Sequence, residues 1–249
     1  MRSSLVAHVV FVLIASLAWS LSDHFNLLDE GFIPRIDAVA SALSTLLGDP
    51  TFLQQARITC MRVLAAIVIA TPIAFTVGFA MGEFYRFGRL LSPSIYLGLA
   101  VPQSIFLPLF MMVFGIDDLQ KIVFGFTHAF FVMTVITVAA VQSVQPTYAV
   151  AARSFGANTR QVYTGIFLPS MAPLLIGAIR LGLIFDIIGV LGAEMYGSRR
   201  GLGILLFRWG EEFQLPKLAG AVLLIAVSTI VMNEVLRAAE LRLEHWKVS

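Results

Sequence analysis

The sequence has little charge and almost no cysteine. Asp, Glu, Lys and Arg make up 13% of its 249 residues, about half the share that is usual in soluble domains. Hydrophobic residues make up 58%, and the mean hydropathy is +0.88. A water-soluble domain cannot hide that much apolar surface, and a disordered chain is polar and rich in charge. The composition therefore indicates an integral membrane protein.

The sequence lacks the residues that several functional classes require. Cys60 is the single cysteine, so the chain has no internal disulfide, and no group of Cys and His has the spacing of a metal site. The formal net charge is +2, without the block of Lys or Arg that nucleic-acid binding requires. No Gly-x-x-x-x-Gly-Lys-Ser/Thr loop is present to bind nucleotide phosphates. A membrane enzyme is disfavoured because no nucleophile and base form a recognisable set. We therefore expect no catalytic residue, no metal and no cofactor bound by this chain.

Uncharged stretches of the chain predict transmembrane helices, which need about 20 apolar residues each. The six candidates are residues 5–21, 63–82, 90–116, 122–144, 170–195 and 218–233. They are continuously apolar rather than alternating, which favours helices over a barrel. The first stretch is alternatively a cleaved secretory signal, with a small-residue cleavage site at 16–18. We expect an all-α integral membrane protein with about six transmembrane helices.

The spans divide the chain into four parts. We expect an N-terminal transmembrane helix in 1–22, an extracytoplasmic amphipathic segment in 23–54, a core of five transmembrane helices in 55–236, and a cytoplasmic tail in 237–249. Apolar residues at helical spacing between Asp37 and Leu47 predict an interfacial helix. Gly78 and Gly82 form a small-xxx-small pair, which suits close helix packing. Basic residues are divided evenly between the two sides, so they do not decide the orientation.

The segment between the fourth and fifth expected spans is the most informative one. Pro146 can begin a short helix, and the small residues Ala151, Ala152 and Gly156 give that helix a face for close packing. Phe155 offers an apolar knob, while Arg153 and Arg160 keep the segment in water. Such a polar helical hairpin suits the docking of a partner protein, although an ordinary connecting loop is an equal alternative on these properties alone.

The spacing in this segment resembles the EAA loop of ABC importer permeases. That pattern is Glu-Ala-Ala, three residues, Gly, nine residues, Ile, one residue and Leu-Pro, and the matching residues are Ala151, Ala152, Gly156, Ile166, Leu168 and Pro169. Val150 stands where the pattern has Glu. A second block, Gly192-Ala-Glu194-Met-Tyr-Gly197-Ser198-Arg-Arg-Gly201-Leu202-Gly203, is similar to a segment of the aliphatic-sulfonate, taurine and nitrate-type permeases. Pro108-Leu109 followed by Phe114-Gly115-Ile116 is similar to the third span of the same subfamily.

The resemblance implies a type I ABC importer permease fold with a cytoplasmic coupling helix in about 146–168. It implies three kinds of partner besides the lipid bilayer of the inner membrane: a second permease chain (identical or paralogous), two ATPase subunits that bind ATP and Mg, and an extracytoplasmic solute-binding protein. Both termini would be cytoplasmic. The solute would be a sulfonate, taurine, a nitrate-like anion or a small heterocyclic precursor. The expected ATPase-coupling residues are Ala151, Ala152, Arg153, Phe155, Gly156, Ala157, Arg160, Ile166, Leu168 and Pro169.

Polar residues inside the spans are candidates for the translocation pathway, because charge in hydrocarbon is costly and usually faces a cavity or a partner. They are Gln103, Ser104, Asp186 and Glu194. Asp186 either lines the pathway or pairs with an Arg or His of a neighbouring helix, such as Arg180 across a dimer. Glu194 is expected mainly to position the outer gate, and His128 to pack. The competing function is an ion-coupled secondary transporter that uses Asp186 and Glu194 as its ion site.

Overall fold

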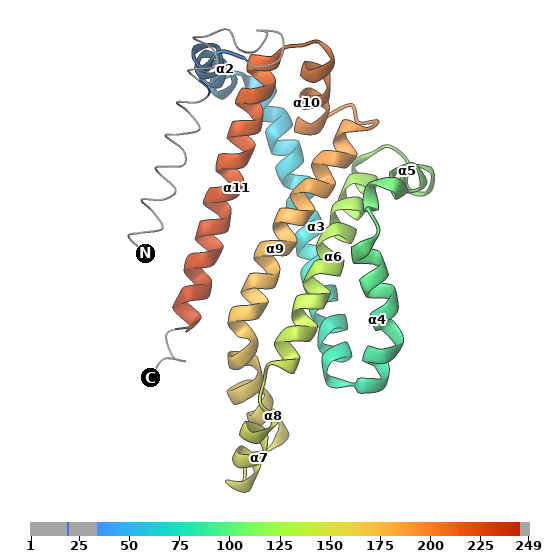
Figure 1. Ribbon diagram of the computed structural model, residues 1–249, viewed down its shortest axis with the longest axis vertical. Coiled ribbons are helices and arrows are strands. Elements are labelled where there is room, and N and C mark those ends of the chain that lie inside the picture. Colours follow the sequence, from blue (N-terminus) through green and yellow to red (C-terminus); the bar gives the residue numbers. More distant parts are fainter. Residues whose placement is uncertain (1–18, 20–33, 245–249) are drawn as a thin grey trace. The chain divides into compact units, whose positions relative to one another are not determined.

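The computed structural model describes Trp19 and residues 34–244, and this part of the chain is helical and contains no strand (Figure 1). Its helices are α2 (Ile36–Gly48), α3 (Pro50–Glu83), α4 (Tyr85–Ala100), η1 (Gln103–Phe106), α5 (Leu107–Phe114), α6 (Asp118–Gln142), α7 (Pro146–Ser154), α8 (Thr159–Val162), η2 (Tyr163–Phe167), α9 (Leu168–Met195), α10 (Leu202–Glu211) and α11 (Leu215–Glu244).

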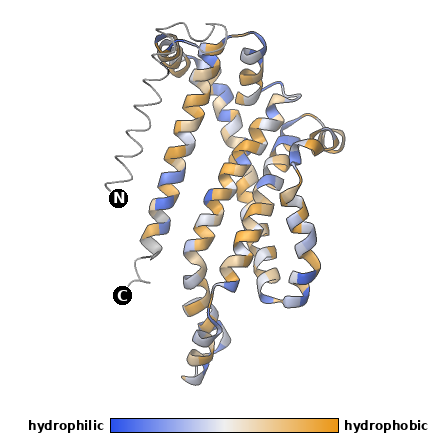
Figure 2. Cartoon of the chain, viewed as in Figure 1, coloured by the Kyte–Doolittle hydropathy of each residue, from blue (hydrophilic) through white to orange (hydrophobic). Residues whose placement is uncertain are grey.

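Four described helices are long and apolar enough to cross a membrane: α3, α6, the continuous run from α8 to α9, and α11. They contain the second, fourth, fifth and sixth expected spans. The pair formed by α4 and η1–α5 also passes this test, although it is bent by 90°. In Figure 2 the long helices carry hydrophobic colours along most of their length, and hydrophilic residues gather where α3 turns into α4. The first expected span, with its alternative as a signal peptide, lies almost wholly outside the described residues.

The third expected span, 90–116, is not a straight helix, which corrects the sequence-based expectation. The helical backbone of α4 ends at Ala100, and Val101 and Pro102 have ψ angles of 129° and 107°. Proline has no backbone N–H to continue the α4 ladder, so the chain leaves the helix here and starts again as η1. The break places the two pathway candidates Gln103 and Ser104 in the first turn after the bend.

The described residues form two compact units. In the unit made of 34–55 and 205–227, α2 buries Val39, Ala42 and Leu46 on one face, as its amphipathic pattern predicts. Leu46 and Ala42 approach Gly220 of α11, and the rings of Phe52 and Trp209 stack with centroids 6.3 Å apart. The amphipathic helix is thus confirmed, with bounds one residue beyond those expected at each end, and its interfacial position stays a prediction.

The second unit, 56–204 with 228–244, holds the main core. Its buried centre comes from α3, α6 and α9, and consists of Val63, Ile67, Ala70, Ala74, Ala129, Met133, Leu183 and Val190. Glycines let these helices approach closely: a Cβ on Gly78 would lie 2.6 Å from Thr137 Cβ, and one on Gly82 would lie 2.6 Å from Val141 Cβ. The predicted packing role of the Gly78/Gly82 pair is therefore confirmed.

Helices α6 and α9 pair closely in the second unit. Gly189 lies against the ring of His128 and the backbone of Gly125, where an added Cβ would meet atoms at 2.9–3.1 Å. An added Cβ on Gly125 would in turn meet Asp186 Oδ1 at 2.2 Å. Two glycines at the crossing therefore allow the backbones to touch, and they set the neighbours of His128 and Asp186.

Candidate functional site

The predicted docking hairpin is well defined and begins where the sequence places it. Pro146 occupies the first turn of α7, and Gly156 ends it with φ of +85°, a conformation that costs glycine little. The N–H of Ala157 donates to the carbonyl of Ala152 at 3.0 Å, which closes the last turn. Asn158 then caps α8 in a capping box: its side chain accepts from the Gln161 N–H at 2.9 Å, and Gln161 Oε1 accepts from the Asn158 N–H at 2.8 Å.

The ten residues that the sequence assigns to ATPase coupling all lie on this hairpin or at the start of α9, and none of them is buried. Phe155 is the most exposed of the large hydrophobic residues that the structure describes, with 93% of its surface accessible. Arg153 and Arg160 are exposed as well. A protruding phenyl ring between two cations, held on a capped turn, is an unusual surface for a connecting loop, because exposed aromatic groups tend to mark contact sites.

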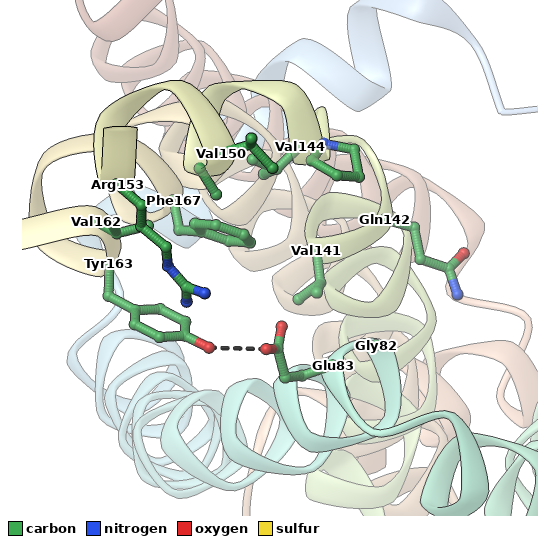
Figure 3. Close-up of a pocket in the computed structure, with 12 residues that line it drawn as sticks. Gly82, Glu83, Val141, Gln142, Val144, Val150, Arg153, Val162, Tyr163 and Phe167 are labelled. Atoms are coloured by element: carbon green, nitrogen blue, oxygen red, sulfur yellow. Dashed lines mark hydrogen bonds between the residues drawn. The ribbon is translucent and has the colours of Figure 1, made fainter. Parts of the chain in front are cut away.

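The hairpin also contacts α3, which the sequence did not indicate. The Tyr163 hydroxyl donates to Oε1 of Glu83, the last residue of α3, at 2.7 Å. Both residues line a cavity of about 450 Å³ together with Val150 and Arg153 (Figure 3). Neither Glu83 nor Tyr163 belongs to a pattern that sequence reasoning could have recognised, because they are 80 residues apart.

At the other end of α9, Glu194 is the centre of a buried polar cluster. Its carboxylate accepts hydrogen bonds from Arg62 Nη1 at 2.6 Å, from the Thr59 hydroxyl at 2.8 Å and from the Gly203 N–H at 2.9 Å. Arg62 Nε also donates to Asp118 at 3.0 Å. The Glu194 side chain is completely buried, so its charge is stable only because these donors surround it.

Glycines of the second motif block close over this cluster. Gly201 has φ of +114°, and a Cβ there would lie 2.3 Å from the Glu194 carboxylate. A Cβ on Gly203 would lie 2.5 Å from Glu194 Cβ. The spacing Glu194, Gly201, Gly203 thus has a direct physical reason: only residues without a side chain allow the loop to cover the carboxylate.

The other pathway candidates occupy different surroundings. Ser104 lines a cavity of about 690 Å³ between η1–α5, α6 and α9, and His128 lines it too. Gln103 donates from Nε2 to the Gly98 carbonyl at 3.4 Å, and its buried Oε1 has no partner within the described part of the chain. Asp186 is completely buried, and neither of its carboxylate oxygens has a hydrogen-bond partner among the described residues. The Arg180 side chain pairs with Glu240 at 3.2 Å rather than with Asp186 within this chain.

The proposed ion site of a secondary transporter gains no support from this arrangement. Asp186 and Glu194 are eight residues apart on α9, a rise of about 12 Å, and Glu194 is already occupied by donors from Thr59, Arg62 and Gly203. The described residues contain no group of three His, Cys, Asp or Glu side chains that could hold a metal ion.

Comparison with known proteins agrees with this architecture. Residues 66–246 match the family described as binding-protein-dependent transport system inner membrane component. The taurine transport system permease protein TauC of Escherichia coli (strain K12) is 29% identical over 233 residues, which cover 92% of this chain and 84% of that protein. A probable ABC transporter permease of Brucella abortus (strain 2308) is 30% identical, over 75% of this chain and 74% of its own. A putative aliphatic sulfonates transport permease, SsuC of Bacillus subtilis (strain 168), is 22% identical, over 93% of this chain and 84% of its own.

The fold has a solved counterpart. An inward-facing structure of the MetNI methionine ABC transporter superposes with a TM-score of 0.62 at 17% identity, covering 74% of this chain and 93% of the matched chain. This likeness identifies the type I ABC importer permease fold. Together with the family match, it makes the chain a multi-pass membrane protein that works with ATPase, binding-protein and further permease subunits. The chain belongs to the family of binding-protein-dependent transport system inner membrane components, and it is the non-catalytic permease subunit of an ABC importer.

Proposed function

We propose that this permease couples to its ATPase through the hairpin of residues 146–168, with Phe155 as the residue that enters a groove on the ATPase. The observation that carries the proposal is the 93% exposure of Phe155 on a turn that Gly156 and the Asn158 capping box hold rigid. A rigid protruding ring loses little entropy on binding, so it is well suited to transmit force. ATP and Mg would bind to the ATPase subunits and not to this chain.

This assignment fixes the orientation that the basic residues left open. Helix α9 has 28 residues, about 42 Å at the rise of an α-helix, which exceeds the hydrocarbon thickness of about 30 Å. The hairpin before α9 and the Glu194 cluster at its end therefore lie on opposite sides of the membrane. With the hairpin in the cytoplasm, the Glu194 cluster faces the solute-binding protein, and both termini are cytoplasmic.

For the solute we propose a small sulfonate such as taurine. Three kinds of support agree: the taurine permease TauC, the aliphatic-sulfonate permease SsuC, and the lining of the 690 Å³ cavity. That lining contains Ser104, His128 and Tyr196 as its polar side chains and no carboxylate, so an anion meets no like charge there. A second permease chain, identical or paralogous, would complete the pathway.

Site-specific crosslinking tests the docking. In a Cys60→Ala background, Phe155→Cys carries a photoactivatable maleimide in the co-expressed importer. The matched control is Phe213→Cys, since Phe213 is 74% exposed but lies before α11, on the opposite side in the proposed topology. Irradiation should join the permease to the ATPase from position 155 and not from position 213. Equal crosslinking from both positions, or none from position 155, would overturn the docking proposal.

Uptake by proteoliposomes that contain the complete importer tests the solute. We expect ATP-dependent uptake of labelled taurine that unlabelled short alkanesulfonates inhibit. We also expect Ser104→Leu to reduce uptake, because the larger side chain occupies the cavity that Ser104 lines. Uptake of neither taurine nor an alkanesulfonate by an importer that hydrolyses ATP would contradict the sulfonate assignment.

A further inference from the structure

A cavity of about 450 Å³ lies at the base of the hairpin, and residues of α3, α7 and η2 line it (Figure 3). Its lining contains four residues with polar side chains, Glu83, Gln142, Arg153 and Tyr163, among small and apolar residues. In Figure 3 the guanidinium group of Arg153 points into the space between Tyr163 and Glu83. Three polar groups therefore face the same cavity between a spanning helix and the docking hairpin.

Tyr163 is held firmly in this cavity. Its hydroxyl donates to Glu83 at 2.7 Å, and its ring contacts Phe79 and Phe167 with centroids 6.1 and 5.2 Å away. It is also the first residue of the π-helical turn η2, and such turns often occur at functional positions. The hydroxyl is thus directed to the end of α3 by packing on both sides of its ring.

Within α3 itself, no interaction favours an acidic residue at position 83. It is the last residue of α3, and the last turn contains no basic residue. The carbonyl end of a helix is the negative end of its dipole, so a carboxylate there destabilises the helix. The position of this acid is explained instead by the groups across the cavity, the Tyr163 hydroxyl and the Arg153 guanidinium.

Val150 lines the same cavity. This residue occupies the position at which the EAA pattern has its glutamate, so the hairpin itself has no acid there. The carboxylate that faces Arg153 and Tyr163 comes from α3 instead. Residue 83 therefore supplies the acidic group that residue 150 lacks.

Helix α6 leads into the hairpin and the hairpin leads into α9, whereas α3 is not adjacent to the hairpin in the chain and meets it through the Glu83–Tyr163 hydrogen bond and the shared cavity. We propose that Glu83 is a positioning residue: through Tyr163 and Arg153 it transmits to α3 the movement that the ATPase imposes on the hairpin. This inference rests on the proposed docking of the hairpin. Loss of Glu83 would leave ATPase binding intact, and would loosen the link between the hairpin and the end of α3.

The variants are Glu83→Ala, Glu83→Gln and Tyr163→Phe, with Glu234→Ala as the matched control. Glu234 is an exposed helical glutamate of α11 that pairs with Arg237 at 3.4 Å, away from this cavity. The quantity to measure is solute transported per ATP hydrolysed in proteoliposomes. We expect this ratio to fall about fivefold in Glu83→Ala and Tyr163→Phe, the effect of losing one hydrogen bond to a charged group at a partly exposed site. The double variant should be no worse than either single one, and Glu83→Gln should lie in between.

Rescue separates a coupling role from a structural one. We expect Val150→Glu to restore the ratio in Glu83→Ala by at least half, because the new carboxylate faces the same cavity and lies three residues before Arg153 on α7. An unchanged ratio in Glu83→Ala, or no rescue by Val150→Glu, would overturn the inference. If Glu83→Ala does not assemble, Tyr163→Phe carries the test, since it removes one oxygen atom only.

The two proposals can fail separately. The crosslink from Phe155→Cys to the ATPase is measured in every variant. A crosslink that persists in Glu83→Ala together with normal coupling rejects the role of Glu83 and leaves the docking proposal intact. Absence of the crosslink in the otherwise unmodified chain rejects the docking proposal, and the role of Glu83 with it.

Discussion

Arg62 Nη1 lies 2.6 Å from Glu194 Oε1, and the two side chains are 6% and 0% exposed. The same Nη1 donates to the Arg200 carbonyl at 2.8 Å, and Nε donates to Asp118 at 3.0 Å. One guanidinium group thus joins α3, α6, α9 and the loop that leads to α10. The cluster fixes that end of the helices relative to each other.

Removal of the Glu194 carboxylate should be strongly destabilising. In Glu194→Ala the buried Arg62 charge loses its main partner, and we expect the free energy of unfolding to fall by about 3–5 kcal/mol. Thermal unfolding of the detergent-solubilised chain measures this effect. Asp118→Asn is the control, because the Asp118 side chain is 72% exposed and exposed ion pairs contribute less than about 1 kcal/mol. Similar losses in both variants would show that Glu194 is not the centre of the cluster.

Two glycines one turn apart on α9 should respond differently to a methyl group. A Cβ on Gly189 would meet His128 at 2.9 Å and the Gly125 backbone at 3.1 Å, whereas a Cβ on Gly192 would meet nothing within 4 Å. We expect Gly189→Ala to destabilise the protein by about 1–3 kcal/mol through overpacking. Gly192→Ala should be neutral or slightly stabilising, because alanine favours helix. The same melting assay compares them, and equal melting temperatures would contradict the close crossing of α6 and α9.

We expect Asp186 to lower the stability of the protein and to support transport. Its two oxygens are buried without partners among the described residues, and an unpartnered buried carboxyl group costs stability. A group that is kept despite such a cost points to a function within the span. We therefore expect slower uptake and altered solute selectivity in Asp186→Asn at unchanged expression. Unaltered uptake would exclude Asp186 from the pathway.

The docking turn depends on a left-handed residue. Gly156 has φ of +85°, and an alanine there costs about 1–2 kcal/mol. Gly156→Ala should thus loosen the hairpin and weaken retention of the ATPase during purification. Gly165→Ala serves as the comparison, since Gly165 also has open space around its Cβ position but lacks a positive φ. The two variants can be ranked by the amount of ATPase that co-purifies at increasing salt.

Local patterns sufficed to predict the docking hairpin and most of the helices. Pro146, Gly156 and Asn158 act on neighbouring backbone groups, so their effects on α7 and α8 can be read from adjacent residues. The amphipathic spacing of α2 has the same local character. Continuous apolar runs predicted α3, α6, α9 and α11, because length and hydropathy alone decide whether a helix can span a bilayer.

Interactions between distant residues could not be predicted in this way. Arg62 lies just outside the expected span 63–82, whereas α3 begins at Pro50 and carries Arg62 into the core. Its partner Glu194 follows 132 residues later, and nothing in the intervening sequence indicates the pairing. The contact between Glu83 and Tyr163 was missed for the same reason. The bend in the third span was missed as well, because α4 and α5 pack against α6, which comes later in the chain.

The Arg62 cluster has a consequence for biosynthesis. Ribosomes make α3 long before α9, so Arg62 enters the membrane without the carboxylate that later neutralises it. Its long side chain can meanwhile keep its charge at the lipid headgroups, since Arg62 directly precedes the apolar stretch of α3. The arrival of α9 then supplies the buried partner of Arg62. Chains that terminate before Glu194 should therefore keep α3 loosely placed, and the membrane's quality-control proteases should degrade them.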